Sequence, residues 1–266
     1  MRNYYYVGTL LPSLSFDIPP EMSFFELDTL LRDNLTVADY DKIRIIRSYY
    51  DIVNLRSFWL GEELDPKGSL SFADLEEAFL NRSGLPEYVF DFAEKYPKNL
   101  DRMHHFSFLL ATFFQTAQWE DRFLRDYFRF ERELRLVITA FRAKKMGRDL
   151  GVELQYENPE EDFIGQLLAY QDAKDYEPPE KYTDLKVIFD KWGENPMALQ
   201  KALDNYRFQK IGTLVDFSDP FSIDRILSYF IRYLLVEKWF TLDQEKGTQI
   251  VNAMNSSAKE KHGTNG

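Results

Sequence analysis

The chain has 266 residues and a mass of 31.6 kDa, enough to bury a substantial core in one large or two small domains. It carries 44 acidic residues against 33 lysines and arginines, a formal net charge of -11, which repels both nucleic-acid phosphates and anionic lipid surfaces. Because the chain has no cysteine, disulfides, thiolate metal sites and cysteine nucleophiles are excluded. We therefore expect neither a nucleic-acid function nor a thiol-based active site.

The sequence gives no sign of a segment that targets or spans a membrane. Its first residues lack the basic segment and the long apolar run of a signal peptide, so we expect a cytoplasmic location. The densest apolar stretch, residues 223–240, is interrupted by several charged side chains. This pattern predicts a buried helix and no direct insertion into the membrane.

The N-terminal residues 3–20 combine tyrosine-rich and leucine-rich runs with Pro12, Pro19 and Pro20. Prolines at this spacing interrupt helices, so the segment is predicted to be a short extended arm. Beyond it the sequence becomes helical in character.

Capping signals divide the next part of the chain into helices. Ser23, Thr36 and Ser71 each precede an acidic residue by three positions, which is the pattern of a capping box. A helical spacing of apolar residues follows each of them, and Pro86 is placed to begin a further helix. The predicted fold class is therefore all-α, a multi-helix and lobed bundle with the extended arm at its start.

The longest helical stretch is predicted over residues 101–146, which contain neither proline nor glycine and end before Gly147. Within this stretch, apolar residues alternate at spacings of four and three. The residues that follow this spacing are Phe123, Tyr127, Phe130, Leu134, Val137 and Phe141. An internal core stripe and an exposed seam for a partner helix both fit the spacing, and the core stripe is the favoured interpretation.

The clearest linker is residues 175–183, where Pro178 and Pro179 exclude regular structure. We therefore predict an N-terminal arm with helical lobes over residues 1–174 and a C-terminal helical lobe over residues 184–254. Residues 255–266 are predicted to form a disordered tail.

Signals for catalysis or metal binding are weak. The sequence has no phosphate-binding glycine loop and no nucleophile-elbow motif. His104 and His105 would diverge by about 100° on a helix, so they cannot both face one metal. Residues 65–76 imitate a calcium loop, but Lys67 stands where a ligand is needed and Leu70 replaces the required glycine. We expect no catalytic residue, no cofactor and no metal site.

One basic cluster stands out from the acidic background, and it consists of Arg142, Lys144, Lys145 and Arg148. Cations in the last turn of a helix are favoured by the helix dipole, which is a sufficient structural reason for them. The alternative is a docking patch for an acidic partner.

Two segments resemble known proteins. The start, Tyr4-Tyr5-Tyr6-Val7 followed by Leu10-Leu11-Pro12-Ser13-Leu14-Ser15-Phe16, resembles an uncharacterised family encoded in V-type ATPase operons of chlamydiae, spirochaetes and Bacteroidetes. Residues 130–141, with the sequence FERELRLVITAF, resemble the long helix of the V-type ATPase C-subunit, which is known as the d-subunit in eukaryotes. Residues 223–247 are similar in character to the last helices of the same V-type ATPase protein.

The resemblance implies a non-catalytic component that couples the central rotor stalk of a V-type ATPase or ATP synthase to the membrane proteolipid ring. Its partners would be proteins of the central stalk and of the ring, and it would lie at the inner membrane peripherally, through those partners. The contact candidates are Tyr4, Tyr5 and Tyr6 in the arm, together with the basic cluster.

Two alternatives stay open. The first is a helical protein-binding module that assists assembly of the same complex without staying in it. The second is an enzyme with an unrecognised acidic site, for which a deep cavity with convergent acids would be needed.

Overall fold

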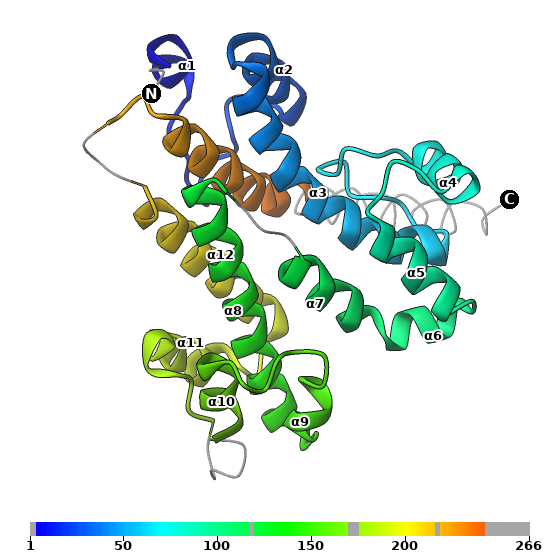
Figure 1. The fold of residues 1–266 in the computed structure, drawn as a ribbon. Coiled ribbons are helices and arrows are strands. Elements are labelled where there is room, and N and C mark those ends of the chain that lie inside the picture. Colours follow the sequence, from blue (N-terminus) through cyan, green and yellow to red (C-terminus); the bar gives the residue numbers. More distant parts are fainter. Residues whose placement is uncertain (1–3, 117–119, 170–175, 216–218, 243–266) are drawn as a thin grey trace, which may run out of the picture. The chain divides into compact units, whose positions relative to one another are not determined.

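The computed structural model describes residues 4–116, 120–169, 176–215 and 219–242. Within these ranges the chain is built of helices, and the nearest approach to a sheet is an isolated bridge between Ser15 and Ile18 (Figure 1). The predicted all-α fold class is confirmed. No helix in the described part of the chain is long and apolar enough to cross a membrane.

The helices follow one another along the whole described chain. Their bounds are α1 Tyr5–Leu10, α2 Phe24–Asn34, α3 Val37–Leu60, α4 Phe72–Asn81, α5 Glu87–Lys95, α6 Asn99–His104, α7 Phe106–Thr116, α8 Arg122–Met146, α9 Leu150–Glu153, α10 Asp162–Ala169, the 3-10 helix η1 Glu180–Tyr182, α11 Asp184–Trp192 and α12 Pro196–Thr213. Residues 223–242 are also helical and are drawn in orange in Figure 1.

The chain divides into two compact units. Unit one contains residues 1–40 and 207–266, and unit two contains residues 41–206. Unit one thus unites the two ends of the sequence, whereas unit two is one continuous segment. The division falls inside α3 and inside α12, so each of these helices contributes residues to both units.

The expected linker at residues 175–183 lies inside unit two. The Tyr176 hydroxyl donates to the Val137 carbonyl at 2.9 Å, and the buried Tyr182 donates to the Glu133 carboxylate at 2.8 Å. The two prolines do interrupt the regular helices, but these tyrosines fasten the segment to α8. A proline pair therefore marks a turn within one core here. The predicted tail, residues 255–266, lies outside the described residues.

The N-terminal arm is helical over α1, which corrects the expectation of an extended segment there. A helix of six residues is too short to be stable by itself, so it depends on tertiary contacts. Within unit one the Tyr5 ring lies 4.5 Å from the Phe221 ring, and a Cβ at Gly8 would come within 2.7 Å of Phe221 Cδ1. Gly8 thus lets α1 pack closely on Phe221, a contact that local sequence patterns do not reveal.

Helix caps in both units follow the predicted pattern. Ser23 and Glu26 form a capping box at the start of α2, and Ser71 and Asp74 form another at the start of α4. At the end of α8, Gly147 adopts the left-handed conformation, with φ of 63°. These local predictions are confirmed because the capping contacts are made within a few residues.

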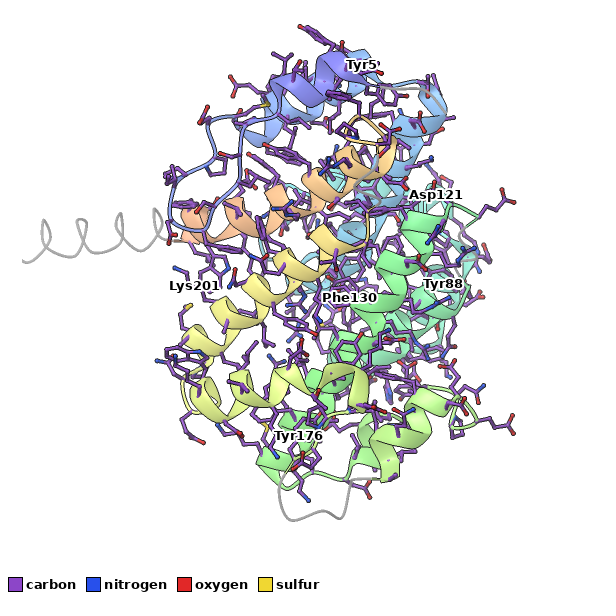
Figure 2. The ribbon with its side chains drawn as sticks, turned by 90° about the vertical axis from the view of Figure 1, so that its left-hand side faces the viewer. Tyr5, Tyr88, Asp121, Phe130, Tyr176 and Lys201 are labelled. Carbon is purple, nitrogen blue, oxygen red and sulfur yellow. The ribbon has the colours of Figure 1, made fainter. Side chains whose placement is uncertain are left out.

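In unit two, α8 supplies the largest single face of the core. Leu134 and Val137 are fully buried, and Phe130 lies between α8 and α12, with its ring 6.4 Å from that of Tyr206 (Figure 2). The heptad-like spacing is therefore an internal core stripe. The predicted long stretch over residues 101–146 is divided, since α6, α7 and α8 are separate helices.

The loop between α3 and α4 is held by side chains of α3. Asp51 accepts backbone N–H groups of Ser69 and Leu70 at 2.5 and 3.0 Å, and Asn54 exchanges two hydrogen bonds with the backbone of Asp65, both at 2.9 Å. Burial raises the pKa of the Asp51 carboxyl group above its ordinary value. The loop that imitates a calcium site is therefore fixed by protein groups.

Candidate functional site

The three N-terminal tyrosines do not form one surface. Tyr4 is buried; its backbone N–H donates to the Phe221 carbonyl at 2.8 Å and its hydroxyl donates to Asp39. Tyr5 and Tyr6, the first residues of α1, are 58% and 64% exposed. Tyr4 therefore anchors the segment, while Tyr5 and Tyr6 present aromatic surface that a partner can contact.

The basic cluster is also divided by the structure. Arg142 is exposed on α8, and Arg148 pairs with Glu153 at 3.3 Å just beyond the end of the helix. Lys145 donates to the Gly193 carbonyl and pairs with Glu194 at 3.0 Å. Arg142 and Arg148 therefore have different surroundings from Lys145, and all four cations lie in unit two, whereas the tyrosines lie in unit one.

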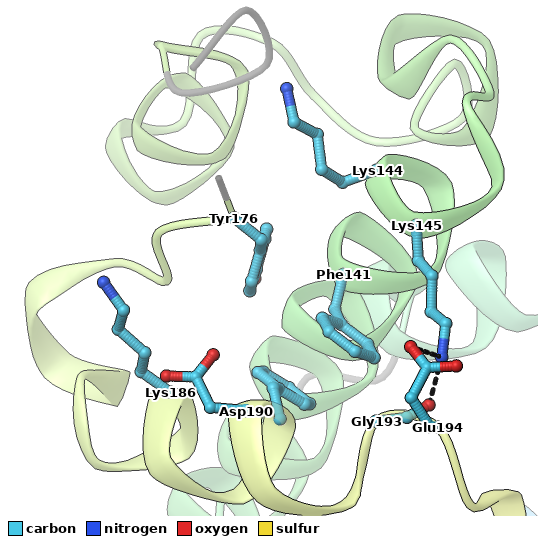
Figure 3. Close-up of a pocket in the computed structure, with 9 residues that line it drawn as sticks. Phe141, Lys144, Lys145, Tyr176, Lys186, Asp190, Gly193 and Glu194 are labelled. Atoms are coloured by element: carbon cyan, nitrogen blue, oxygen red, sulfur yellow. Dashed lines mark hydrogen bonds and ion pairs between the residues drawn. The ribbon is translucent and has the colours of Figure 1, made fainter. Parts of the chain in front are cut away.

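Lys144 and Lys145 line a cavity of about 570 Å³ in unit two (Figure 3). Its other walls come from α11 and from the chain around residue 176. The lining residues are Phe141, Lys144, Lys145, Tyr176, Lys186, Phe189, Asp190, Gly193 and Glu194. Three ammonium groups and two carboxylates thus surround a group of aromatic rings.

The aromatic rings of this cavity are packed on one another. Phe141 and Phe189 stack with their centroids 4.1 Å apart and their planes 8° from parallel. Tyr176 meets Phe141 edge-on at 5.7 Å, and burial raises the pKa of its hydroxyl above the ordinary value. A Cβ at Gly193 would come within 2.5 Å of the Phe189 carbonyl oxygen, so only glycine fits this wall without a shift.

Sequence patterns indicate only part of this cavity. Lys144 and Lys145 are conspicuous as cations, and Phe141 by its helical spacing. Lys186 and Phe189 carry no such signal, because they come from α11, which the fold places opposite α8 at this point. The proline pair before α11 is the nearest sequence feature, and it indicates a linker.

A second cluster of charged side chains joins α8 to the segment at residues 157–161. Glu157, with a side chain 3% exposed, accepts from Arg132 at 2.7 Å and from Arg135 at 2.5 Å, and Arg132 also pairs with Glu161 at 2.8 Å. Two arginines compensate the one buried carboxylate, so this arrangement is structural. It ties the segment at residues 157–161 to α8.

Of the two adjacent histidines, His105 packs against tyrosine side chains. Its ring stacks on Tyr96 with centroids 4.3 Å apart, and its Nδ1 lies 2.6 Å from the Tyr156 hydroxyl. Across the residues that the structure describes, no group of three or more His, Asp and Glu side chains is arranged to hold a metal ion. The ring contacts of His105 give this residue a packing role in unit two.

Comparison with known proteins places the chain in a family. A family model described as "Protein of unknown function (DUF2764)" matches residues 1–258. An uncharacterized protein of Chlamydia trachomatis is 28% identical over 262 residues, which cover 96% of this chain and 98% of that protein. A Chlamydia pneumoniae protein is 28% identical over 270 residues, which cover 97% of this chain and 100% of that protein. No solved structure shows significant similarity.

These full-length matches confirm the coarser part of the resemblance noted in the sequence, namely an uncharacterised family with chlamydial members. They cover both compact units and the residues of the cavity. The chain belongs to the family described as Protein of unknown function (DUF2764).

Proposed function

We propose that this protein is a non-catalytic component of a V-type ATPase or ATP synthase, similar to the C-subunit of these machines, that couples the central rotor stalk to the membrane proteolipid ring. The proposal starts from the resemblance of residues 4–16 and 130–141 to proteins of that system. It places the chain at the inner membrane through its partners, and its work is mechanical.

The observation that carries the proposal furthest is the exposed tyrosine pair on an anchored helix. Tyr5 and Tyr6 are more than half exposed, yet Tyr4 beside them is buried and hydrogen-bonded to Asp39 and Phe221. Tyrosine is enriched in protein interfaces, and a side chain that is already positioned loses little conformational entropy on binding. This surface suits a partner protein.

The build of α8 supports the mechanical part of the proposal. This helix of 25 residues buries a continuous aromatic and aliphatic face, and close-packed interiors transmit strain with little compliance. The exposed Arg142 near its C-terminal end gives an acidic partner a cation to contact. Torque would thus be carried through the helix instead of being absorbed by it.

The decisive experiment is affinity purification of the tagged chain from native membranes, with the recovered proteins identified and quantified by mass spectrometry. A component of the machine is recovered with stalk and ring proteins in a fixed ratio. Recovery in partly assembled complexes alone would favour the assembly module. Recovery with neither stalk nor ring proteins would remove the proposal.

A pair of variants tests the tyrosine surface in the same purification. Tyr5→Ala together with Tyr6→Ala removes the exposed aromatic area and should lower recovery of the partners at least about tenfold, the effect of losing interface hot spots. Leu80→Ala is the control, because Leu80 is 85% exposed and lies in the other unit. Equal recovery with both variants would exclude this surface from the interface.

A further inference from the structure

The cavity at the end of α8 has a size and lining that suit a small ligand. Binding sites for small molecules typically enclose roughly 300–1,000 Å³ and combine apolar walls with a few convergent polar groups. The volume of about 570 Å³ falls in this range. The lining supplies the apolar walls through Phe141, Tyr176 and Phe189, and the polar groups through lysines and acids.

The three ammonium groups of the cavity lie at different places in its wall. Lys145 is fixed to the Gly193 carbonyl and to Glu194, so it closes one side (Figure 3). Lys144 from α8 and Lys186 from α11 extend on either side of Tyr176 in the same view. A ligand that rests on the tyrosine ring would therefore have a cation on each side.

The ion pair of Lys186 with Glu177 does not prevent Lys186 from contacting an anionic ligand. Lys186 pairs with Glu177, and their side chains are 41% and 44% exposed. Exposed pairs of this kind contribute little to stability because water and salt screen them. An anionic group that enters the cavity can thus draw Lys186 away from Glu177 without a large loss to the fold.

The acids of the lining limit the ligand further. Asp190 and Glu194 also border the cavity, so a molecule that carries negative charge at both ends would meet repulsion at one of them. The hydroxyl of Tyr176 is already engaged by the Val137 carbonyl, which leaves the lysines as the main groups for recognising an anion. The favoured ligand has one anionic end and one apolar end.

We propose that this cavity binds a small organic anion that carries a flat apolar group. The flat group rests against Phe141 and Tyr176, and the anionic group lies between Lys144 and Lys186. This inference does not depend on the role in a V-type ATPase.

The test uses the full-length protein and isothermal titration calorimetry with anilinonaphthalene sulfonate, an aromatic anion of the right class. The wild-type protein should bind it at a single site. Lys144→Gln with Lys186→Gln should raise the dissociation constant at least about tenfold, because each change removes a charge-assisted contact. Lys201→Gln, at an exposed lysine on α12 of the same unit (Figure 2), should change the dissociation constant by less than about twofold. An unchanged dissociation constant in the double variant would overturn the proposal.

Two further titrations separate the parts of the ligand. Uncharged phenylnaphthylamine and inorganic phosphate should each bind much more weakly than the aromatic sulfonate. Equal binding of phenylnaphthylamine would refute the role of the lysines, and equal binding of phosphate would refute the role of the rings.

A charge-conserving variant gives a further test. Lys144→Arg with Lys186→Arg keeps both charges and should retain binding of the aromatic sulfonate, so a loss of binding would also count against the proposal. Thermal unfolding of every variant verifies that the fold is intact.

Discussion

Tyr4 and Tyr6 lie two positions apart and have opposite environments. The hydroxyl of Tyr4 donates to the Asp39 carboxylate inside unit one, and Thr36 Oγ1 lies 3.4 Å from it. Tyr6 is 64% exposed, and the Thr9 hydroxyl donates to its backbone carbonyl. The phenolic hydroxyl is therefore structurally important in Tyr4 and not in Tyr6.

Removing the two hydroxyls should separate these roles. Tyr4→Phe removes the hydrogen bond from Tyr4 to Asp39, which still accepts from Thr36 Oγ1 at 3.0 Å, and should lower the free energy of unfolding by about 1.5–3 kcal/mol, as expected for a hydrogen bond to a charged group. Tyr6→Phe should change it by less than about 0.5 kcal/mol, as surface substitutions usually do. Urea denaturation of both variants measures the difference. Equal stability of the two proteins would mean that the Tyr4–Asp39 bond contributes nothing.

At this scale the sequence supports only a partial prediction. The run of three tyrosines indicates a contact surface, but it does not reveal that Tyr4 is buried, because Asp39 and Phe221 reach it from distant parts of the chain. The same reason applies to Lys186 and Phe189 in the cavity. Residues brought together by the fold leave no local pattern.

At the scale of elements, glycines show how position decides the effect of one residue type. Gly147 ends α8 with φ of 63°, and Gly165 lies inside α10 with an ordinary helical backbone. A Cβ would meet no atom within 4 Å at either position. The two sites therefore differ in backbone conformation and not in available space.

Alanine at these two glycines should have effects of opposite sign. Gly147→Ala forces an L-residue into the left-handed region and should lower the free energy of unfolding by about 1–2 kcal/mol. Gly165→Ala should raise it by about 0.5–1 kcal/mol, because alanine restricts the unfolded chain and favours helix. Thermal and urea unfolding give both values. A gain in stability from Gly147→Ala would contradict the assigned C-terminal cap of α8.

Elements with local signals are those that the sequence predicts well. The capping boxes at Ser23 and Ser71 and the terminator at Gly147 depend on neighbours within a few residues, and all three are confirmed. The sequence predicts an extended segment where α1 lies, because Pro12 and the tyrosine run are typical of strands or arms. Helix α1 packs on Phe221, a residue more than two hundred positions away, and buries Val7.

On the scale of the whole molecule, unit one depends on both ends of the sequence. The Tyr233 hydroxyl donates to the Met22 carbonyl at 2.9 Å, and the Tyr4 backbone donates to Phe221. Unit two does not depend on contacts between the two ends of the sequence, because residues 41–206 supply its core, including Leu134 and Val137. The sequence does not indicate this division, since no composition signal marks positions 40 and 207.

Truncation after residue 206 should affect the two units differently. Residues 4–34 lose their partners in the C-terminal segment and should exchange their amide hydrogens close to the rate of an unfolded chain. Most of residues 41–206 should keep slow exchange. Hydrogen exchange with mass spectrometry of full-length and truncated proteins measures both regions. Protection of residues 4–34 in the truncated protein would show that the N-terminal segment folds without the C-terminal one.

Unit one is built from the two ends of the sequence, and this has a consequence for biosynthesis. Residues 1–40 leave the ribosome first, yet they must wait for all of residues 41–206 to be made before Phe221 and Tyr233 emerge. At translation rates of about 5–20 residues per second, this delay is on the order of ten to thirty seconds. During that time the rings of Tyr5 and Phe24 lack their contacts with Phe221 and Phe230, so nascent chains should be clients of ribosome-associated chaperones.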